Sequence, residues 1–265
     1  MSRYTTKLAV IEGARPVIEA VRAGRRAIHE VWLPEGDGSP ARRELERLLA
    51  GAGIRMRSAR PGEGVRAHAD PFPEEDFEAL LVSESPRLLV ALDRVTDVGN
   101  LGSIARTADA AGATGLILEH RHAPPIGAGA LRASAGALEH LRVGRTPNLA
   151  KALDLAVEEG ITVLVAEAGA PSLERISDDL LRGDLIWVLG SEDRGSRPGV
   201  RRRASALVGI PLAGRTSSLG VAAAAAYLLL RTAEVRVAGE KRTNAGSDSA
   251  AHEASQMGGG TDEIS

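Results

Sequence analysis

Three short segments carry polar side chains that could bind a ligand or take part in a reaction, and each segment follows an apolar run. Asn100 and Arg106 come after the first run, Glu192 after the second and Ser218 after the third. Amide, carboxylate and hydroxyl groups can hold a ligand or exchange protons, and a guanidinium can bind phosphate through two parallel hydrogen bonds. Taken singly, each residue also has an ordinary explanation as a helix cap, a core contact or a solvated charge. The pattern points to chemistry only if the fold brings the three segments together.

The same segments are rich in glycine, which lets a backbone approach a ligand closely. The first contains DVGNLG at 97–102 and the second GSEDRG at 190–195. The third contains IPL at 210–212 and SSLG at 217–220, followed by an alanine-rich stretch. Loops of this kind after parallel strands hold ligands at the N-termini of helices.

The elements that must position these loops alternate along the second part of the chain. Apolar runs predict strands, and amphipathic or alanine-rich stretches predict helices. The predicted strands are 88–92, 115–118, 161–166, 185–189 and 206–210, and the predicted helices are 100–111, 149–159 and 217–235. This alternation predicts an α/β fold with a parallel sheet covered on both faces.

The rest of the chain divides into three further segments. The pattern of residues 1–72 predicts a small α/β unit, with helices at 14–23 and 39–50 and strands at 28–33 and 54–58. Ser39 is expected to cap the second helix. The proline-rich, acidic stretch 73–87 predicts a linker, and 88–236 forms the larger domain. The Gly-, Ser-, Thr- and acid-rich stretch 237–265 predicts a disordered tail.

Composition excludes several classes of protein. With 43% hydrophobic but only 2% aromatic residues, the core must be aliphatic, and aromatic platforms for base stacking are not expected. The absence of cysteine excludes disulfides and thiolate metal sites, and is typical of a cytoplasmic protein. No apolar run is long enough to span a bilayer, so no membrane association is expected. His120 and His122, the one close histidine pair, are interpreted as a solvated loop, and no metal site is expected.

The charge distribution is more informative than the net charge of −2. Residues 1–66 contain thirteen basic and eight acidic residues, and the basic residues of the chain are nearly all arginine, which suits phosphate. Arg22, Arg25 and Arg26 lie near the end of the first predicted helix and are therefore candidates for binding the phosphates of a nucleic acid.

In this order, the three segments closely resemble the SpoU family of RNA ribose 2′-O-methyltransferases, from about Leu88 to Arg231. The matching patterns are D-x-V-x-D-x-x-N-x-G-x-x-x-R from Asp93, G-x-E-x-x-G from Gly190, and I-P-M followed by S-L-N in the third segment. The third segment departs from the family at two places, with Leu212 for Met and Gly220 for Asn. The stretch 131–140 resembles the family's K-x-S-x-G-A-x-E, and 11–20 resembles its opening G-x-x-x-V-x-E-A.

This resemblance implies S-adenosylmethionine as cofactor, no metal, and a homodimer. It implies a SPOUT-type domain with a C-terminal trefoil knot, preceded by an L30e-like RNA-binding domain. The active-site residues that it implies are Asn100, Arg106, Glu192 and Ser218. Backbone groups of the loop at Gly190, of Ile210 and of Leu219 would hold the cofactor, with Ser191, Gly195 and Leu212 in the same pocket.

The expected reaction is methylation of a ribose in structured RNA, with a guanosine of 23S rRNA favoured and tRNA as the alternative. A second alternative is a catalytically weak RNA-binding protein of the same fold, because Gly220 removes a side-chain amide. A dinucleotide-dependent oxidoreductase is disfavoured, because G-x-G-x-x-G is missing after the first strand of the larger domain. The family assigns the general base to the residue matching Arg106. Since guanidinium stays protonated in proteins, Arg106 could instead bind the adjacent phosphate and lower the pKa of the hydroxyl.

Overall fold

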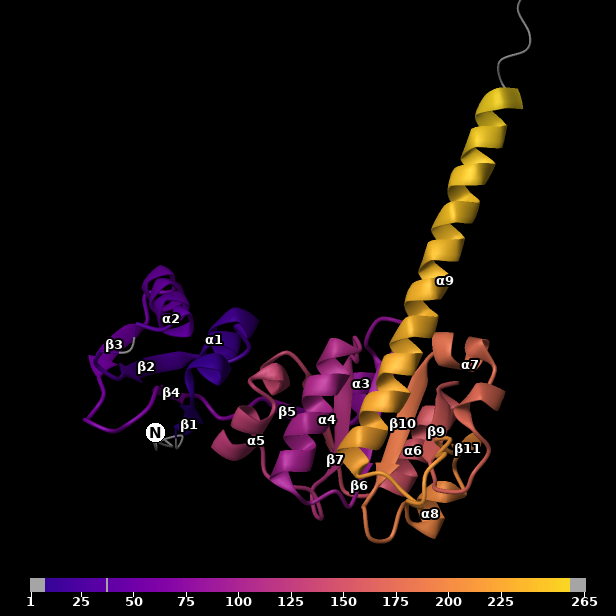
Figure 1. Ribbon diagram of the computed structural model, residues 1–265, viewed down its shortest axis with the longest axis horizontal. Helices are drawn as coiled ribbons and strands as arrows, with labels where there is room; N and C mark the ends of the chain where they lie inside the picture. Colours follow the sequence, from indigo (N-terminus) through magenta and orange to yellow (C-terminus); the bar gives the residue numbers. More distant parts are fainter. Residues whose placement is uncertain (1–7, 37, 258–265) are drawn as a thin grey trace, which may run out of the picture.

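The computed structural model describes residues 8–36 and 38–257, with side chains as far as Gly239. The described chain forms a small N-terminal α/β unit and a larger α/β unit, placed side by side (Figure 1). None of the described helices is both long and apolar enough to cross a membrane.

The N-terminal unit is a four-stranded sheet in the order β1-β4-β2-β3, in which only the β2–β3 pair is parallel. Its elements are β1 (Ala9–Glu12), α1 (Ala14–Ala23), β2 (Ile28–Leu33), α2 (Pro40–Gly51), β3 (Arg55–Ser58) and β4 (Arg66–Ala69). The Ser39 side chain accepts a hydrogen bond from the Arg42 N–H at 3.2 Å, which confirms the predicted cap of α2. One face of the sheet is buried against α1 and α2 through alternating apolar residues, namely Ile11, Val31, Leu33, Ala67 and Ala69.

The predicted linker at 73–87 is not a free connection. It contains β5 (Glu74–Asp76), which pairs in parallel with β8 (Arg142–Thr146), and the short helix α3 (Glu78–Leu81). Phe77 and Leu80 are almost completely buried beneath the larger sheet. The apolar side chains between the prolines therefore outweigh the acidic, proline-rich composition that suggested a linker.

The larger unit confirms the predicted α/β class with a parallel sheet. Its seven strands are all parallel, in the order β11-β9-β10-β6-β7-β8-β5. The strands after β5 are β6 (Leu88–Asp93), β7 (Gly115–Glu119), β8 (Arg142–Thr146), β9 (Thr162–Ala166), β10 (Leu185–Gly190) and β11 (Ala206–Val208).

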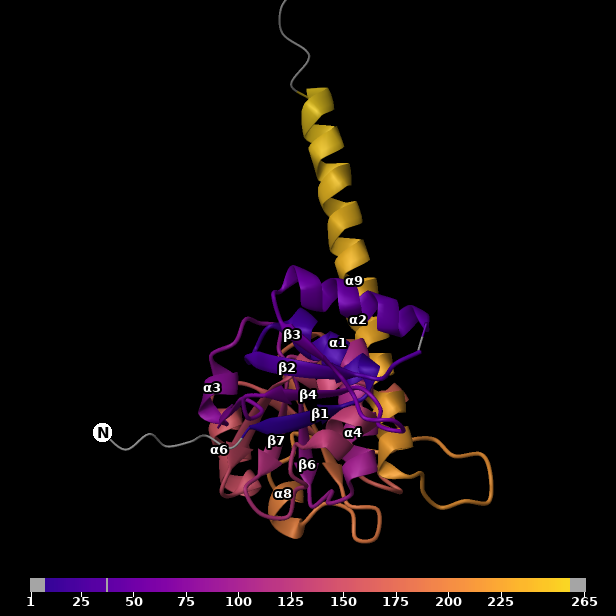
Figure 2. The same ribbon diagram turned by 90° about the vertical axis from the view of Figure 1, so that its left-hand side faces the viewer.

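Helices cover both faces of this sheet (Figures 1 and 2). On one face, α4 (Val98–Ala110) contacts α9 (Val221–Met257), and Leu101 and Leu228 of these helices belong to the same core as the β6 residue Val90. On the other face, Leu153 of α6 packs with Leu89. The helices of this unit are α4 (Val98–Ala110), α5 (Ala128–Ala133), α6 (Leu149–Glu158), α7 (Asp178–Arg182), α8 (Pro198–Arg201) and α9 (Val221–Met257), with short 3₁₀ helices at Ala137–Glu139 and Leu173–Arg175.

Helix α9 differs from the sequence-based expectation at both ends. It begins at Val221 rather than Ser217, and it continues as helix to Met257 through most of the predicted disordered tail, beyond the edge of the sheet (Figure 1). The Ala, Glu, Lys, Arg and Gln residues in this stretch favour helix, and the packed first turns supply the nucleus from which it propagates. Residues 258–265 of the predicted tail lie outside the described residues.

The two units are joined by a buried ion pair between Arg26 and Glu139, whose side chains are 2% and 1% exposed. The Arg26 Nε also donates to Glu139 at 3.2 Å, and Arg25 donates to the backbone oxygen of Leu141. Arg25 and Arg26, which the sequence analysis singled out for RNA binding, are thus used in the contact between the units. Arg22 is exposed and pairs with glutamates of its own unit.

Candidate functional site

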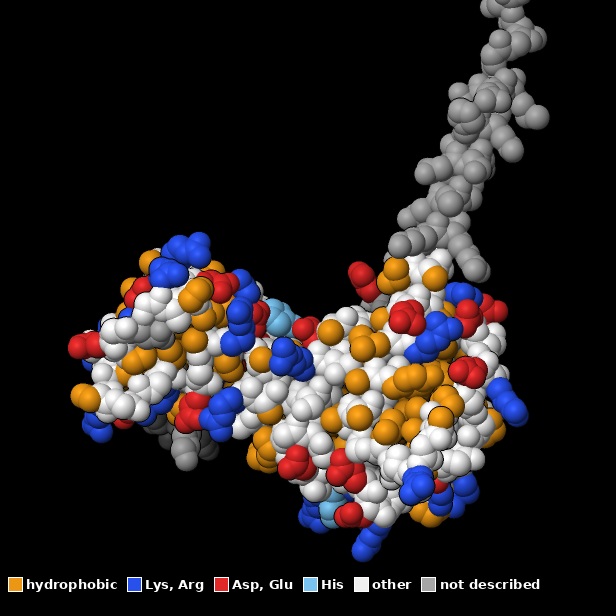
Figure 3. Space-filling view, viewed as in Figure 1, with side chains coloured by type: hydrophobic (Ala, Val, Ile, Leu, Met, Phe, Trp, Pro, Cys, Tyr) orange, Lys and Arg blue, Asp and Glu red, His pale blue; other side chains and the backbone are white. Residues whose placement is uncertain are grey.

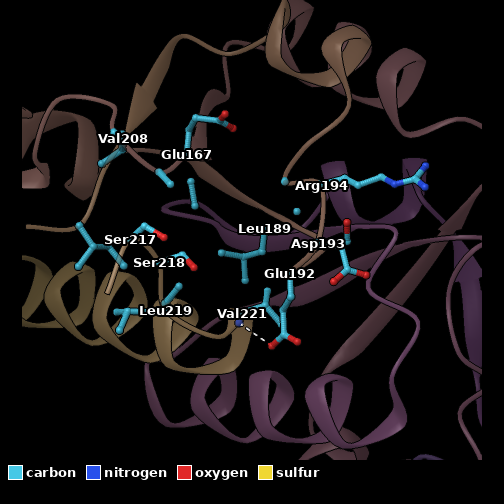
Figure 4. Close-up of a pocket in the computed structure, with 18 of the residues that line it drawn as sticks. Glu167, Leu189, Glu192, Asp193, Arg194, Val208, Ser217, Ser218, Leu219 and Val221 are labelled. Atoms are coloured by element: carbon cyan, nitrogen blue, oxygen red, sulfur yellow. Dashed lines mark hydrogen bonds between the residues drawn. The ribbon is translucent and has the colours of Figure 1, made fainter. Parts of the chain in front are cut away.

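A cavity of about 340 Å³ lies at the carboxyl ends of β9, β10 and β11, where open α/β sheets bind ligands (Figure 4). Its walls are the loop after β9, the loop after β10, and the segment that connects β11 to α9. All six residues that the sequence assigns to the cofactor line it: Gly190, Ser191, Gly195, Ile210, Leu212 and Leu219.

The loop after β10 has a conformation that depends on glycine. A Cβ atom at Gly190 would lie 2.3 Å from backbone atoms of both Gly195 and Ser196, so any side chain there would displace the loop. Gly195 has φ +62°, and its N–H donates to the Ser191 oxygen at 2.8 Å. The loop folds back on itself and presents its backbone to the cavity.

A buried charge network anchors this loop to the sheet. Asp93, at the end of β6, is fully buried and accepts hydrogen bonds from the Arg197 N–H at 2.7 Å and Nε at 2.6 Å. The same guanidinium donates to Glu119, at the end of β7, at 2.8 Å. Burial alone would lower the pKa of Arg197, but the two carboxylates outweigh it and raise the pKa. Sequence reasoning missed Arg197 and Glu119, since neither belongs to a matched pattern.

Glu192 connects three loops. Its Oε1 accepts a hydrogen bond from the Val221 N–H at 3.0 Å, shown as a dashed line in Figure 4, and a longer one from the Asn100 side-chain amide at 3.4 Å. Asn100 is free for this contact because Asp97 caps α4, accepting from the Asn100 N–H at 2.7 Å. The expected start of α4 at Asn100 is therefore corrected to Val98.

The departure at Gly220 lies against Glu192. A Cβ atom at this position would be 3.1 Å from the Glu192 Oε1, closer than most Cβ contacts. Glycine leaves room for the carboxylate to reach the first N–H of α9. The chain thus lacks the asparagine amide of the family at position 220, and the loop that carries Glu192 caps α9 instead.

Glu167 is a cavity residue that the sequence analysis did not single out. One of its oxygens accepts from Arg201 at 2.8 Å, whereas Oε2 is buried without a hydrogen-bond partner among the described residues. In Figure 4 it lies across the cavity from Ser218 and Leu219. The one feature of the sequence that could have pointed to Glu167 is its position directly after the apolar run of β9.

The fold brings three of the four expected catalytic residues together. Ser218 and Glu192 line the cavity, and Asn100 contacts Glu192. Arg106 is exposed on α4 and does not line this cavity, and its side chain makes no hydrogen bond or ion pair with another described residue. Within the described chain, no group of His, Asp and Glu side chains is arranged to hold a metal ion.

The cavity combines backbone walls rich in glycine with more acidic than basic side chains. Glu167, Glu192 and Asp193 line it together with a single arginine, Arg194. Such a site suits an elongated ligand that carries positive charge and needs several hydrogen bonds from the backbone.

Comparisons with known proteins agree with this geometry. The model of the SpoU rRNA methylase family matches residues 87–230, and a model described as RNA 2′-O ribose methyltransferase substrate binding matches residues 10–62. The chain is 31% identical over 250 residues to an uncharacterized tRNA/rRNA methyltransferase of Mycolicibacterium vanbaalenii, covering 88% of this chain and 79% of the relative. It is also 31% identical to the 23S rRNA (guanosine-2′-O-)-methyltransferase RlmB of Pseudomonas putida, covering 87% and 98%.

A solved structure shares the fold. The SpoU methyltransferase AviRb of Streptomyces viridochromogenes, in complex with the cofactor AdoMet, matches with a TM-score of 0.73 at 26% identity, covering 86% of this chain and 90% of that one.

Proposed function

The chain belongs to the SpoU rRNA methylase family and is an RNA 2′-O-ribose methyltransferase, and we propose that its substrate is a guanosine of 23S ribosomal RNA. The similarity to RlmB over nearly the whole of both chains supports this substrate. The single observation of the structure that supports methyl transfer by this chain is the cavity at the ends of three adjacent strands, lined by all six residues expected to hold the cofactor.

The residues present fit S-adenosylmethionine, which supplies an electrophilic methyl group when bound. The folded-back loop at Gly190 offers backbone groups where a side chain would intrude, and the Glu167 Oε2 is a buried acceptor without a donor among the described residues. We assign the cofactor to this cavity, held by backbone groups of Gly190, Ile210 and Leu219. The excess of carboxylates suits a sulfonium cation.

The chain's own residues must position and deprotonate a ribose 2′-hydroxyl, which is a weak nucleophile. Ser218 and the Asn100–Glu192 pair would orient the ribose at the cavity, since they are polar groups held by the fold at its wall. Arg106 would bind the neighbouring phosphate. Because its guanidinium remains protonated, its contribution is to stabilise the charge that develops as the hydroxyl loses its proton.

A homodimer would explain why Arg106 lies outside the cavity of its own chain, because the site would then be shared between two copies. Helix α9 leaves an apolar stripe exposed with helical spacing, formed by Ala223, Tyr227 and Leu230, with the exposed Glu234 next along the same face and Val237 beyond it. Hydrophobic side chains gather on this face of the larger unit in Figure 3, where α9 crosses it in Figure 1. We propose that a second copy packs on this stripe.

We also propose that the β11–α9 segment completes a trefoil knot and that residues 1–72 form an L30e-like substrate-binding domain. The first is supported by two contacts of this segment, from the Gly209 N–H to the Pro171 oxygen at 2.8 Å and from Val221 to Glu192. The second is supported by the match of residues 10–62 to the substrate-binding family.

Mapping of 2′-O-methyl groups in 23S rRNA and tRNA tests the proposal. A strain lacking the gene should lose methylation at one 23S rRNA guanosine, and the intact gene should restore it. Loss at a tRNA position would replace the proposed substrate. If no position changes and the purified protein transfers no methyl group to either RNA, the chain is a catalytically weak RNA-binding protein.

A further inference from the structure

The face of the N-terminal sheet opposite α1 and α2 carries aromatic and basic side chains. Because side chains alternate along a strand, burial of Val31, Leu33 and Ala67 against the helices places Trp32 and Arg66 on the other face. The register puts Trp32 directly between Arg57 on β3 and Arg66 on β4. Helix α5 contacts the sheet at β1, where Arg132 pairs with Glu12, and the part of this face over β2 and β4 carries a hollow.

A hollow of about 530 Å³ opens there, lined by Trp32, Ser58, Arg60, Glu63, Arg66 and His68. The rings of Trp32 and His68 meet edge to face, with centroids 4.4 Å apart, and the Arg66 guanidinium carbon lies 5.1 Å from the Trp32 ring centroid. The Arg66 Nε is buried and has no hydrogen-bond partner in the described chain. The hollow thus combines the aromatic surface of Trp32 with the Arg66 Nε–H, a hydrogen-bond donor that no described residue uses.

Positive charge exceeds negative charge around the hollow. Arg57 pairs with Glu30 at 2.5 Å, and Arg66 pairs loosely with Glu63 at 3.8 Å. Arg55 and Arg60 make no ion pair with any other described residue, although both are exposed. Two guanidinium groups are therefore available for phosphates next to the hollow.

We propose that this hollow binds an unpaired nucleobase of the RNA substrate. The base stacks beside the Trp32 ring and the Arg66 guanidinium, and the Arg66 Nε–H donates a hydrogen bond to an acceptor atom of the base. Arg55 and Arg60 contact the flanking phosphates. Bases inside a duplex do not expose their faces, so the hollow selects a loop, a bulge or a single strand. This inference rests on the proposed function only in taking RNA as the partner.

The position of the hollow gives it a role separate from the reaction. β2 and β3 lie at one end of the molecule and β11 at the other (Figure 1), so within one chain the hollow is remote from the cavity. It anchors a nucleotide that is distinct from the one methylated. A single well-placed tryptophan supplies this site in spite of the low aromatic content that spoke against base stacking.

The two tryptophans allow a direct test. Trp187 is fully buried and donates to Thr232, so an RNA ligand can quench only Trp32. We expect a single-stranded RNA hexanucleotide to quench the fluorescence of the full chain, whereas ribose 5-phosphate and a blunt duplex of the same sequence do not. Equal quenching by ribose 5-phosphate, or none by the hexanucleotide, overturns the proposal.

Substitutions provide the second arm, with binding of labelled hexanucleotide measured by anisotropy. Trp32→Leu should weaken binding roughly 5- to 100-fold, whereas Trp32→Phe retains most of it because the ring can still stack. Arg66→Gln should weaken binding about tenfold. The control Arg47→Gln, an exposed arginine on α2, removes the same charge elsewhere and should change binding less than about twofold. Equal effects of Arg66→Gln and Arg47→Gln contradict the proposal, even if Trp32→Leu fails to fold.

Methyl transfer by the wild-type chain is measured in parallel, so that the two proposals can fail separately. Transfer to 23S rRNA without quenching overturns the base-binding hollow alone. Quenching without transfer supports the hollow and counts against the proposed reaction.

Discussion

The carboxylate of Glu192 accepts a hydrogen bond at 3.0 Å from the backbone N–H of Val221, the first residue of α9. These residues are 29 positions apart, so the helix is capped from a different loop rather than by its own preceding residues. A negative charge at this place also interacts favourably with the N-terminal end of the helix. The contact holds the loop after β10 against the start of α9 on one wall of the cavity.

Replacement of Glu192 should therefore loosen the cofactor site. Glu192→Ala removes both the acceptor and the charge, and we expect weaker binding of S-adenosylhomocysteine by calorimetry and a loss of about 1 kcal/mol in the free energy of unfolding. Glu192→Gln keeps a hydrogen-bond acceptor, so its cofactor affinity and its free energy of unfolding should lie between those of Glu192→Ala and the wild type. Glu158→Ala, at the exposed end of α6, is the control. Wild-type affinity in Glu192→Ala would refute the assigned role.

Gly190→Ala should abolish cofactor binding, because its Cβ would lie 2.3 Å from the backbone of Gly195 and Ser196. Gly127→Ala is a matched control, since nothing lies within 4 Å of the Cβ position there and Gly127, at the start of α5, does not line the cavity. Calorimetry with S-adenosylhomocysteine compares the two variants, and circular dichroism checks that both are folded. Equal affinities would show that the loop does not form the binding wall.

Arg106→Ala should lower the rate of methyl transfer by about 10²–10⁴-fold, the range for loss of a positioned catalytic group, while cofactor affinity stays within a few fold. Arg106→Lys keeps the charge but not the planar fork, and should recover only part of the rate. Single-turnover transfer of labelled methyl to RNA measures both. Full activity of Arg106→Ala would remove this residue from the active site.

The buried pair of Arg26 and Glu139 should be sensitive to the loss of one partner. Arg26→Met leaves the Glu139 carboxylate buried without its guanidinium and should cost about 3–5 kcal/mol in the free energy of unfolding. The double variant with Glu139→Leu should recover much of this loss, because no unpaired charge remains. Urea unfolding of the single and double variants measures the difference, and equal stabilities of the two would contradict this account.

Asp184 should make the protein sensitive to acid. Burial raises its pKa, but hydrogen bonds from Arg87 and Ser85 outweigh that effect and lower it from 3.8 to about 2. A lowered pKa in the folded state stabilises the fold above the unfolded value, and this contribution, about 2 kcal/mol, is lost as pH falls from about 4 to about 2. Asp184→Asn should flatten this part of the profile of unfolding free energy against pH. Identical slopes for the two proteins would rule out the contribution.

The sequence predicted the parallel sheet and the cavity walls because buried strands and glycine-rich loops leave strong local patterns. It missed β5 and β8, since β5 is only three residues long and β8 contains two arginines. It also missed the part of Arg25 and Arg26 in the contact between the units, because their partner Glu139 lies more than a hundred residues away and no local signal marks such a contact. The Asp93–Arg197–Glu119 network was missed for the same reason.

The placement of β5 determines where the chain can be divided. A shortened chain that begins at residue 87, where the match to the methylase family starts, loses β5 and leaves β8 as an unpaired edge of the sheet. Exposed strand edges pair with strands of other molecules, so such a fragment should aggregate. A fragment that begins before Glu74 keeps β5 paired along the edge of β8. The start of the family match therefore differs from the point at which the larger unit keeps all seven of its strands. A gain or loss of the N-terminal unit during evolution would have to preserve the residues of β5.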